Sequence, residues 1–191
     1  MTGLLVVGGT GLLGRALLTA AGPDTDATHH VSAPTGAARW HELDLADGGD
    51  RAADLIRRLR PSAVVNAAYV ANGPTLTAVT AEAPGAMAAA CAEVGARFVH
   101  LSSDVVFDGT TVRPYVEADR PCPVHDYGKA KAAAERAVEA AGSAAVIVRT
   151  SLLWSADGHG GPQVGLVRDP HITFFTDEIR CPLRVDRLAP E

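Results

Sequence analysis

The chain has 191 residues, of which 47% are hydrophobic and 20% are charged, and its formal net charge is −5. This composition is typical of a globular domain with a sizeable core and excludes an intrinsically disordered chain. The acidic balance argues against nucleic acids and anionic membrane surfaces as partners, and no apolar run approaches the roughly 18 residues of a membrane span.

The cysteines Cys91, Cys122 and Cys181 are widely spaced and form no CxxC pair. The N-terminus also lacks the charged head and the small-residue cleavage site of a signal peptide. We therefore expect a cytoplasmic protein with reduced thiols and without a metal site.

Short apolar segments alternate with helical patterns along the chain, which is the signature of a parallel sheet covered by helices on both faces. The expected strands are 4–7, 28–32, 40–43, 63–66, 97–101 and 145–148. The expected helices are 12–21, 50–59, 75–94 and 127–141, the third interrupted at Pro84 and closed by Gly95. The predicted fold is α/β, a doubly wound parallel sheet of the Rossmann type.

The C-terminal part of the chain carries weaker signals. The stretch 157–162 is typical of a loop, and 172–175 is the candidate for a final strand. We expect a dinucleotide-binding domain over 1–153 and a small, partial substrate-binding segment over 154–191.

A glycine-rich turn follows the first strand directly and opens the first helix. Gly8 permits the tight turn, Gly11 lets the backbone approach a pyrophosphate, and Gly14 lets helix and strand pack closely. A purely structural turn is the alternative, but exposed N–H groups at a helix N-terminus favour phosphate, so we predict NADP(H) or NAD(H) as cofactor. The residues of this turn expected to bind it are Gly8, Thr10, Gly11, Leu12, Leu13 and Gly14.

The choice between NAD and NADP depends on the region after the second strand. The stretch 29–34 contains no carboxylate to accept from a ribose 2′-hydroxyl. Arg39 is a candidate partner for a 2′-phosphate, although a solvated surface arginine is an equal alternative. The sequence therefore favours NADP only slightly.

Tyr127 and Lys131 stand four residues apart on one expected helix, so one helix face presents both. A tyrosine hydroxyl has a pKa of about 10, and a nearby ammonium favours the phenolate and lowers that pKa. The pair predicts a proton donor for a carbonyl, with Lys131 also holding ribose hydroxyls of the cofactor. This spacing alone occurs by chance on many surface helices.

Ser103 supplies the context that the Tyr/Lys pair needs. It follows the strand at 97–101, so it lies at the carboxyl edge of the sheet, where doubly wound folds bind ligands. There Ser103 would donate to the carbonyl oxygen that Tyr127 protonates; the alternative is that Ser102 and Ser103 only cap a turn. The order of glycine turn, serine and Tyr/Lys helix favours catalysis by Ser103, Tyr127 and Lys131.

Together these residues resemble the extended short-chain dehydrogenase/reductases, most closely the dTDP-4-dehydrorhamnose reductase branch. The resemblance covers residues 4–188 and rests on Gly8–Gly14, Asp44-Leu45, Asn66-Ala67-Ala68, Ser102–Gly109, Tyr127–Lys131 with Glu135, and Val148–Ser151. It implies that Asp44 and Leu45 lie by the adenine and that Asn66, Ala67 and Ala68 line the cofactor. The implied reaction is hydride delivery to the 4-keto group of a nucleotide-linked sugar, a small-molecule substrate.

The chain departs from the branch in the expected substrate pocket. Ser103, Asp104, Val105 and Leu152 are its expected contacts, but the branch has aromatic residues where Val105 and Leu152 stand. This favours a different keto sugar or another ketone as substrate, unless Trp154 or Phe174 restores the aromatic contact. An asparagine of the branch is replaced by Thr80, which weakens the proton relay.

The sequence is compatible with three functions. A ketone reductase is favoured by the complete catalytic set, and it is compatible with a homodimer. A non-catalytic dinucleotide-binding partner, like the regulatory subunit of methionine adenosyltransferase, is the second reading. An epimerase or dehydratase is the third, but Asp104 has no following glutamate to supply a dehydratase's second carboxylate.

Overall fold

The fold is built on a six-stranded parallel sheet with strand order β3-β2-β1-β4-β5-β6. The computed structural model describes residues 2–32, 34–142, 144–156, 171, 173 and 176–190. The strands of the sheet are β1 (Thr2–Val7), β2 (Asp26–His29), β3 (Arg39–Glu42), β4 (Pro61–Asn66), β5 (Arg97–Ser103) and β6 (Ala145–Thr150). The predicted doubly wound α/β fold is therefore confirmed.

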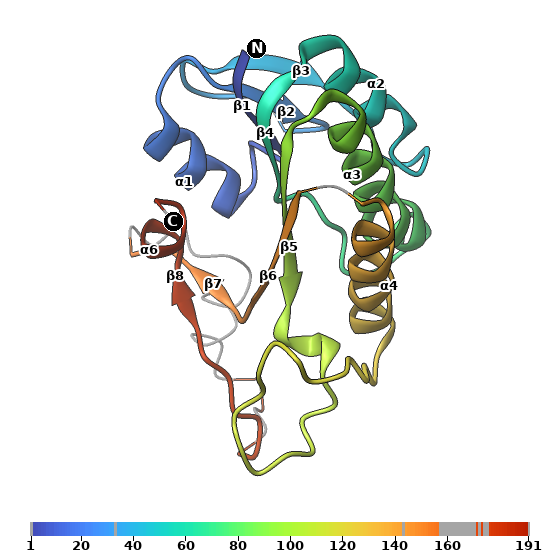
Figure 1. Cartoon of the computed structure of the whole chain (residues 1–191). Helices are drawn as coiled ribbons and strands as arrows, with labels where there is room; N and C mark the ends of the chain where they lie inside the picture. Colours follow the sequence, from blue (N-terminus) through green and yellow to red (C-terminus); the bar gives the residue numbers. More distant parts are fainter. Residues whose placement is uncertain are drawn as a thin grey trace.

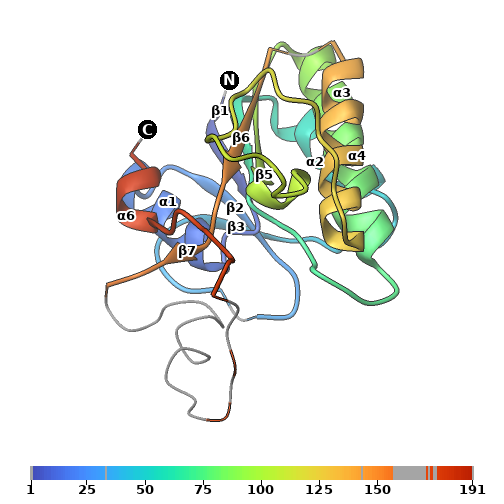
Figure 2. The same ribbon diagram turned by 90° about the horizontal axis from the view of Figure 1, so that it is seen from below.

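Helices cover both faces of this sheet (Figures 1 and 2). One face carries α2 (Asp50–Leu59), α3 (Ala83–Val94) and α4 (Asp126–Ala140), and the other carries α1 (Leu12–Ala21) and α6 (Val185–Leu188). The remaining elements are η1 (Thr77–Glu82), η2 (Asp104–Val106), and the two short parallel strands β7 (Leu153–Trp154) and β8 (Leu183–Arg184). Within the described part of the chain, no helix combines the length and the apolar character that a membrane span requires.

Strand β1 lies at the centre and pairs with both β2 and β4, so the chain reverses its direction of winding there. The main core fills the space between the sheet and α2 and α3, with Leu5, Ile56, Met87 and Phe98 fully buried. Ligands bind outside the carboxyl ends of the strands at such a switch point. The end of β1 at Val7 and the end of β4 at Asn66 therefore mark the candidate site.

Some predicted boundaries were wrong or incomplete. The second strand is Asp26–His29 rather than 28–32, and the expected helix over 75–94 is divided into the π-helical η1 and the α-helical α3. Pro84 occupies the first turn of α3, where a missing N–H costs nothing, so it does not interrupt that helix. The expected loop at 157–162 lies outside the described residues, as does most of the expected strand at 172–175, of which only Thr173 is described.

His100 is a fully buried polar side chain in the middle of β5. Its ring stacks on Phe98, and its Nδ1 lies 3.3 Å from the side-chain nitrogen of Asn66. Burial, and secondarily the Lys131 ammonium, lower the pKa of His100 to about 3. The imidazole is therefore neutral in the folded protein at physiological pH.

His100 is expected to make folding stability depend on pH. Between pH 7 and pH 5 the unfolded chain takes up a proton at this histidine and the folded chain does not, so stability falls as the pH falls. The His100 contribution over this interval is about 2 kcal/mol. Urea unfolding at several pH values should show a shallower pH dependence for His100→Gln than for the wild type; equal slopes would contradict the assignment.

Candidate functional site

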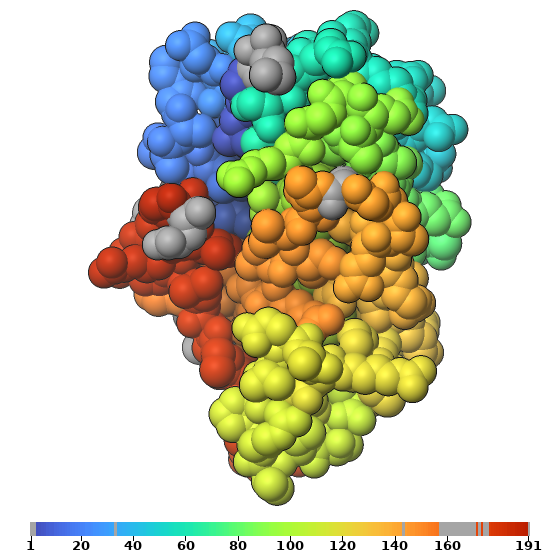
Figure 3. Space-filling model, viewed as in Figure 1, coloured from blue at the N-terminus to red at the C-terminus, as the bar shows by residue number. Residues whose placement is uncertain are grey.

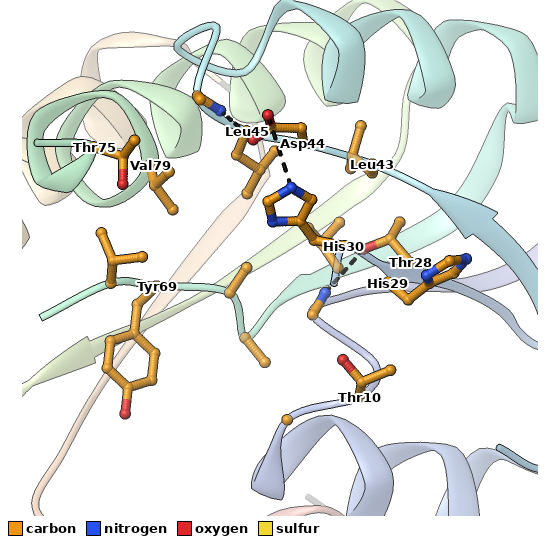
Figure 4. Close-up of a pocket in the computed structure, with 17 residues that line it drawn as sticks. Thr10, Thr28, His29, His30, Leu43, Asp44, Leu45, Tyr69, Thr75 and Val79 are labelled. Carbon is orange, nitrogen blue, oxygen red and sulfur yellow. Dashed lines mark hydrogen bonds and ion pairs between the residues drawn. The ribbon is translucent and has the colours of Figure 1, made fainter. Parts of the chain in front are cut away.

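A pocket of about 410 Å³ opens at the carboxyl edge of the sheet, where β1, β2, β3 and β4 end (Figure 4). It is placed at the switch point that the strand order defines. Its lining comes from the glycine turn, the ends of β2 and β3, the segment after β4, and the start of η1. The lining residues are Val7, Gly8, Thr10, Gly11, Thr28, His29, His30, Leu43, Asp44, Leu45, Ala46, Ala67, Ala68, Tyr69, Val70, Thr75 and Val79.

The glycine turn is shaped by close backbone contacts. Gly8 has φ +86°, its N–H donates to the Thr28 hydroxyl at 3.0 Å, and a Cβ there would lie 2.8 Å from the Ala68 nitrogen. A Cβ on Gly14 would overlap the Gly8 carbonyl oxygen. Gly11 is the N-cap of α1 and places no side chain on the first N–H groups of that helix. Those donors and the positive end of the helix dipole fit the phosphates of a dinucleotide.

The expected cofactor residues divide into two groups. Gly8, Thr10, Gly11, Asp44, Leu45, Ala67 and Ala68 line the pocket, whereas Leu12, Leu13, Gly14 and Asn66 do not. Leu12 and Leu13 pack in a second apolar cluster with Leu101 and Val185. Asn66 is buried, and its side-chain oxygen accepts from the Ala68 N–H at 3.1 Å, so it fixes the backbone of the pocket wall.

The candidate role of Arg39 in binding a 2′-phosphate was wrong. Arg39 begins β3 and its guanidinium donates to the Asp26 carboxylate at 2.9 Å, at the amino end of β2. The pocket lies at the opposite, carboxyl end of these strands, beside His29 and His30. Burial opposes the charge on Asp26, but hydrogen bonds from Arg39 and His41 outweigh it and hold the pKa of Asp26 below its usual value.

Several lining residues were not anticipated. His30 enters the pocket with its Nε2 3.8 Å from the Asp44 carboxylate, and Tyr69 stands across the pocket from Thr28 (Figure 4). Thr28 and His30 flank His29, the last residue of β2, and a correct boundary for that strand would have identified them. Tyr69 follows Asn66-Ala67-Ala68 directly in the sequence, but nothing in its local pattern marks a ligand contact.

Helix α4 carries the Tyr/Lys pair and is held close to the end of β5. His125 caps this helix, its Nδ1 accepting from the Gly128 N–H at 3.1 Å. A Cβ on Gly128 would overlap the carbonyl oxygen of Val105, which belongs to η2 after β5. Only glycine permits this approach, and it brings Tyr127 to the edge where β5 ends.

Lys131 is 3% exposed and lies beside two tyrosine rings that also contact each other. Its Nζ donates to the Leu101 carbonyl at 2.7 Å, and it lies 5.6 Å from the ring centroid of Tyr69 and 5.9 Å from that of Tyr127. Burial lowers the pKa of Lys131 to about 8, and the Glu135 carboxylate acts in the opposite direction. The structure therefore brings Tyr127 and Lys131 together, as the helical spacing predicts.

The expected effect of Lys131 on Tyr127 is reversed in the structure. Burial, then the neighbouring Tyr69 and the Asp104 carboxylate, raise the pKa of Tyr127 above its ordinary value. The Lys131 ammonium is bonded to a backbone carbonyl and lies 5.9 Å from the Tyr127 ring centroid, and the net shift of the Tyr127 pKa is still upward. Tyr127 consequently keeps its proton at neutral pH, which is the form a proton donor requires.

The two serines at the end of β5 have different surroundings. Ser102 is buried and donates to the Glu135 carboxylate at 2.5 Å, and Glu135 is also paired with Arg149 at 2.8 Å. Ser103 is partly exposed, caps η2 by accepting from the Val105 N–H at 3.4 Å, and donates to Asp104 at 3.3 Å. Ser102 is therefore structural, whereas Ser103 caps a turn and remains at the surface of the edge.

The C-terminal segment reaches the same edge through Arg180. Its guanidinium bonds Asp104 at 2.9 Å, Ser151 at 3.4 Å and Glu178 at 3.0 Å. Figure 3 shows this segment, in red, beside β6 and the loop that follows β5. No signal in the sequence marked Arg180.

The two residues that replace the aromatic positions of the branch, Val105 and Leu152, follow β5 and β6 respectively. Val105 is in η2, and Leu152 lies just before β7, where its carbonyl accepts from Leu183. The Trp154 ring is covered by Arg184 at 5.7 Å, and Phe174 lies outside the described residues. Thr80 is buried in η1 with its hydroxyl bonded to both the N–H and the carbonyl of Val70, so it holds the pocket wall.

A sheet of this order, with a glycine turn at its switch point and a Tyr/Lys helix against the neighbouring strand, defines an extended short-chain dehydrogenase/reductase. The family model described as "RmlD substrate binding domain" matches residues 1–190. The chain belongs to this family.

Three relatives illustrate the range of the family. The "Probable low-salt glycan biosynthesis reductase Agl14" of Haloferax volcanii is 33% identical over 96% of this chain and 67% of its own length. A dTDP-4-dehydrorhamnose reductase of Burkholderia thailandensis is 41% identical over 60% of this chain and 42% of its own length. Methionine adenosyltransferase 2 subunit beta of Pongo abelii is 34% identical over 93% of this chain and 52% of its own length.

The same fold is found in a solved structure. A dTDP-4-dehydrorhamnose reductase from Bacillus anthracis in complex with NADP superimposes with a TM-score of 0.78 at 24% identity, over 97% of this chain and 67% of that one. At this identity the likeness shows the fold alone. The chain spans about half the length of the Burkholderia and Pongo relatives.

Gly11→Val is expected to abolish dinucleotide binding while the chain stays folded. A Cβ at this position meets only the Gly8 carbonyl, at 3.3 Å, but a branched side chain fills the space a pyrophosphate needs. Titration calorimetry with NADPH and NADH measures the loss. Gly14→Ala is the contrast, because its Cβ overlaps backbone and should lower the melting temperature; wild-type affinity in Gly11→Val would show that dinucleotides bind elsewhere.

Proposed function

We propose that this chain is an NAD(P)H-dependent reductase whose substrate is a nucleotide-linked 4-keto sugar. The observation that carries the proposal is the continuity between the pocket at the glycine turn and the Tyr127/Lys131 pair, joined by Tyr69, which lines the pocket and contacts Tyr127. The names of the Haloferax and Burkholderia relatives support a reductase, and the Burkholderia name supports the substrate class.

The residues present fit a nicotinamide dinucleotide. Gly8 and Gly11 form a backbone cradle at the pocket, Gly14 lets α1 pack closely against it, and Asp44, Leu45, Ala67 and Ala68 continue the same pocket. These residues would hold the adenosine and pyrophosphate, and Lys131 would hold the ribose on the nicotinamide side. The bound cofactor would supply a hydride for the carbonyl carbon.

Residues of the chain supply the proton that the carbonyl oxygen takes up. Tyr127 keeps its hydroxyl proton at neutral pH and donates it to the substrate's carbonyl oxygen, which becomes an alcohol. Ser103 donates a second hydrogen bond to that oxygen and orients it. Burial of Lys131 keeps water away from its ammonium, which stays beside the Tyr127 ring.

Tyr127→Phe is expected to lower kcat by roughly 100-fold or more, the range for loss of one positioned general acid, and to leave the dinucleotide Kd nearly unchanged. Lys131→Ala should weaken both turnover and dinucleotide binding, because it serves both. Single-turnover kinetics and fluorescence titration separate the two quantities. Full reductase activity in Tyr127→Phe would rule out this mechanism.

A non-catalytic dinucleotide-binding partner is the second candidate, and the likeness to the methionine adenosyltransferase subunit favours it. Dinucleotide binding without NADPH oxidation on any carbonyl would support this function. The complete Ser103, Tyr127 and Lys131 set supports the reductase instead.

Substrate choice is expected to differ from that of the rhamnose enzymes. Two aromatic stacking contacts replaced by Val105 and Leu152 correspond to a loss of roughly 10- to 10⁴-fold in affinity. The highest kcat/KM should therefore be found with a carbonyl other than dTDP-4-dehydrorhamnose, in a panel of keto sugar nucleotides and simpler ketones. Efficient turnover of dTDP-4-dehydrorhamnose alone would contradict this specificity but not the reductase function.

Three further expectations belong to the proposal. The domain limits, 1–153 for the dinucleotide and 154–191 for part of the substrate lobe, stay predictions. A homodimer and a cytoplasmic location also stay predictions. Sedimentation analysis of the purified chain tests for the homodimer.

A further inference from the structure

Tyr69 is a large aromatic side chain that is not part of the hydrophobic core. It follows β4, lines the pocket at the switch point, and is 54% exposed. Its ring centroid lies 5.8 Å from that of Tyr127, with the two planes inclined at 49°. An exposed tyrosine at a ligand edge, directed toward a second tyrosine, calls for an explanation other than packing.

The Tyr69 ring lies close to the buried Lys131 ammonium. Nζ has one hydrogen bond to protein, the Leu101 carbonyl at 2.7 Å, among the described residues. It lies 5.6 Å from the Tyr69 centroid and 5.9 Å from the Tyr127 centroid, inside the range of about 6 Å in which a cation is attracted to a ring face. The two rings therefore contribute to stabilising a charge that has almost no access to water.

We propose that Tyr69 is a positioning residue for Lys131, its ring lying against the ammonium beside that of Tyr127 where the dinucleotide pocket meets the catalytic pair. The proposal rests on the proposed reductase function for its catalytic meaning, but the contact itself does not. A ring face attracts a cation without occupying an N–H donor. The ammonium thus remains charged and still has donors for a ribose hydroxyl.

The charge on Lys131 depends on few groups. From α4 the Glu135 carboxylate favours the charged form, and from β5 the buried His100 is neutral. Glu135 is itself paired with Arg149 and bonded to Ser102, which reduces its effect on Lys131. With burial bringing the pKa of Lys131 to about 8, the loss of one ring should change its titration measurably.

The chain offers a direct measurement, because Lys129 and Lys131 are its only lysines. Lysine labelled with ¹³C at Cε should give two signals, and exposed Lys129, paired with Asp126 at 3.1 Å, serves as an internal reference. In Tyr69→Leu, which keeps an apolar cover, the titration midpoint of Lys131 should fall by roughly half to one pH unit. Tyr69→Phe, which keeps the ring, should leave it unchanged.

A third variant serves as a control, because it removes a tyrosine that does not contact Lys131. Tyr115 stacks on Phe107 at 4.1 Å and bonds Asp108, so Tyr115→Leu should leave the Lys131 signal in place. An unchanged or raised Lys131 midpoint in Tyr69→Leu overturns the proposal, as does a Tyr69→Phe variant that behaves like Tyr69→Leu.

Kinetics test the catalytic meaning separately. The alkaline limb of the kcat/KM profile, which reports groups of the free enzyme, should move to lower pH in Tyr69→Leu by the same interval as the Lys131 signal, and should be restored in Tyr69→Phe. A moved signal in a protein that reduces no keto sugar nucleotide would uphold the role of Tyr69 and refute the reductase function. A moved signal with an unmoved limb in an active enzyme would show that Tyr69 does not act in catalysis.

Discussion

The whole site depends on two places where backbone approaches backbone too closely for any side chain. At Gly14 the first turn of α1 lies against the Gly8 carbonyl, and at Gly128 the first turn of α4 lies against the Val105 carbonyl. The first contact sets the glycine turn beneath the pocket, and the second sets Tyr127 at the end of β5. Both helices are thus positioned by the absence of a Cβ, which is a more rigid constraint than side-chain packing, because backbone atoms cannot change rotamer.

Many helices and strands could be predicted from the sequence because the residues that start and end them are local. The limits of α1 and α2 follow from Gly22 and Pro61 and were predicted without error. The β2 limits were wrong because Asp26 looks like a loop residue, yet Arg39 and His41 pair with it across β3. The short strands β7 and β8 join residues thirty positions apart, and no local pattern encodes such a pairing.

The site was predictable where chemistry imposes a spacing and not where the fold brings separate segments together. The glycine turn and the Tyr127/Lys131 pair have fixed intervals, so they were found. Tyr69 and Arg180 join the site only through the topology. The direction of the Tyr127 pKa was also wrong, because a spacing indicates that Lys131 is near but not how deeply the phenol is buried or where the ammonium is bonded.

The ion pair between Arg180 and Asp104 couples the attachment of the C-terminal segment to ligand binding at the site. A ligand group that takes the place of the guanidinium at the Asp104 carboxylate, 2.9 Å away, competes with it for that oxygen. By linkage, a ligand that displaces Arg180 loosens the attachment of residues 176–182, and a firmly attached segment weakens that ligand by the same factor. Affinity at the end of β5 and order in the segment are therefore two measures of one coupling free energy.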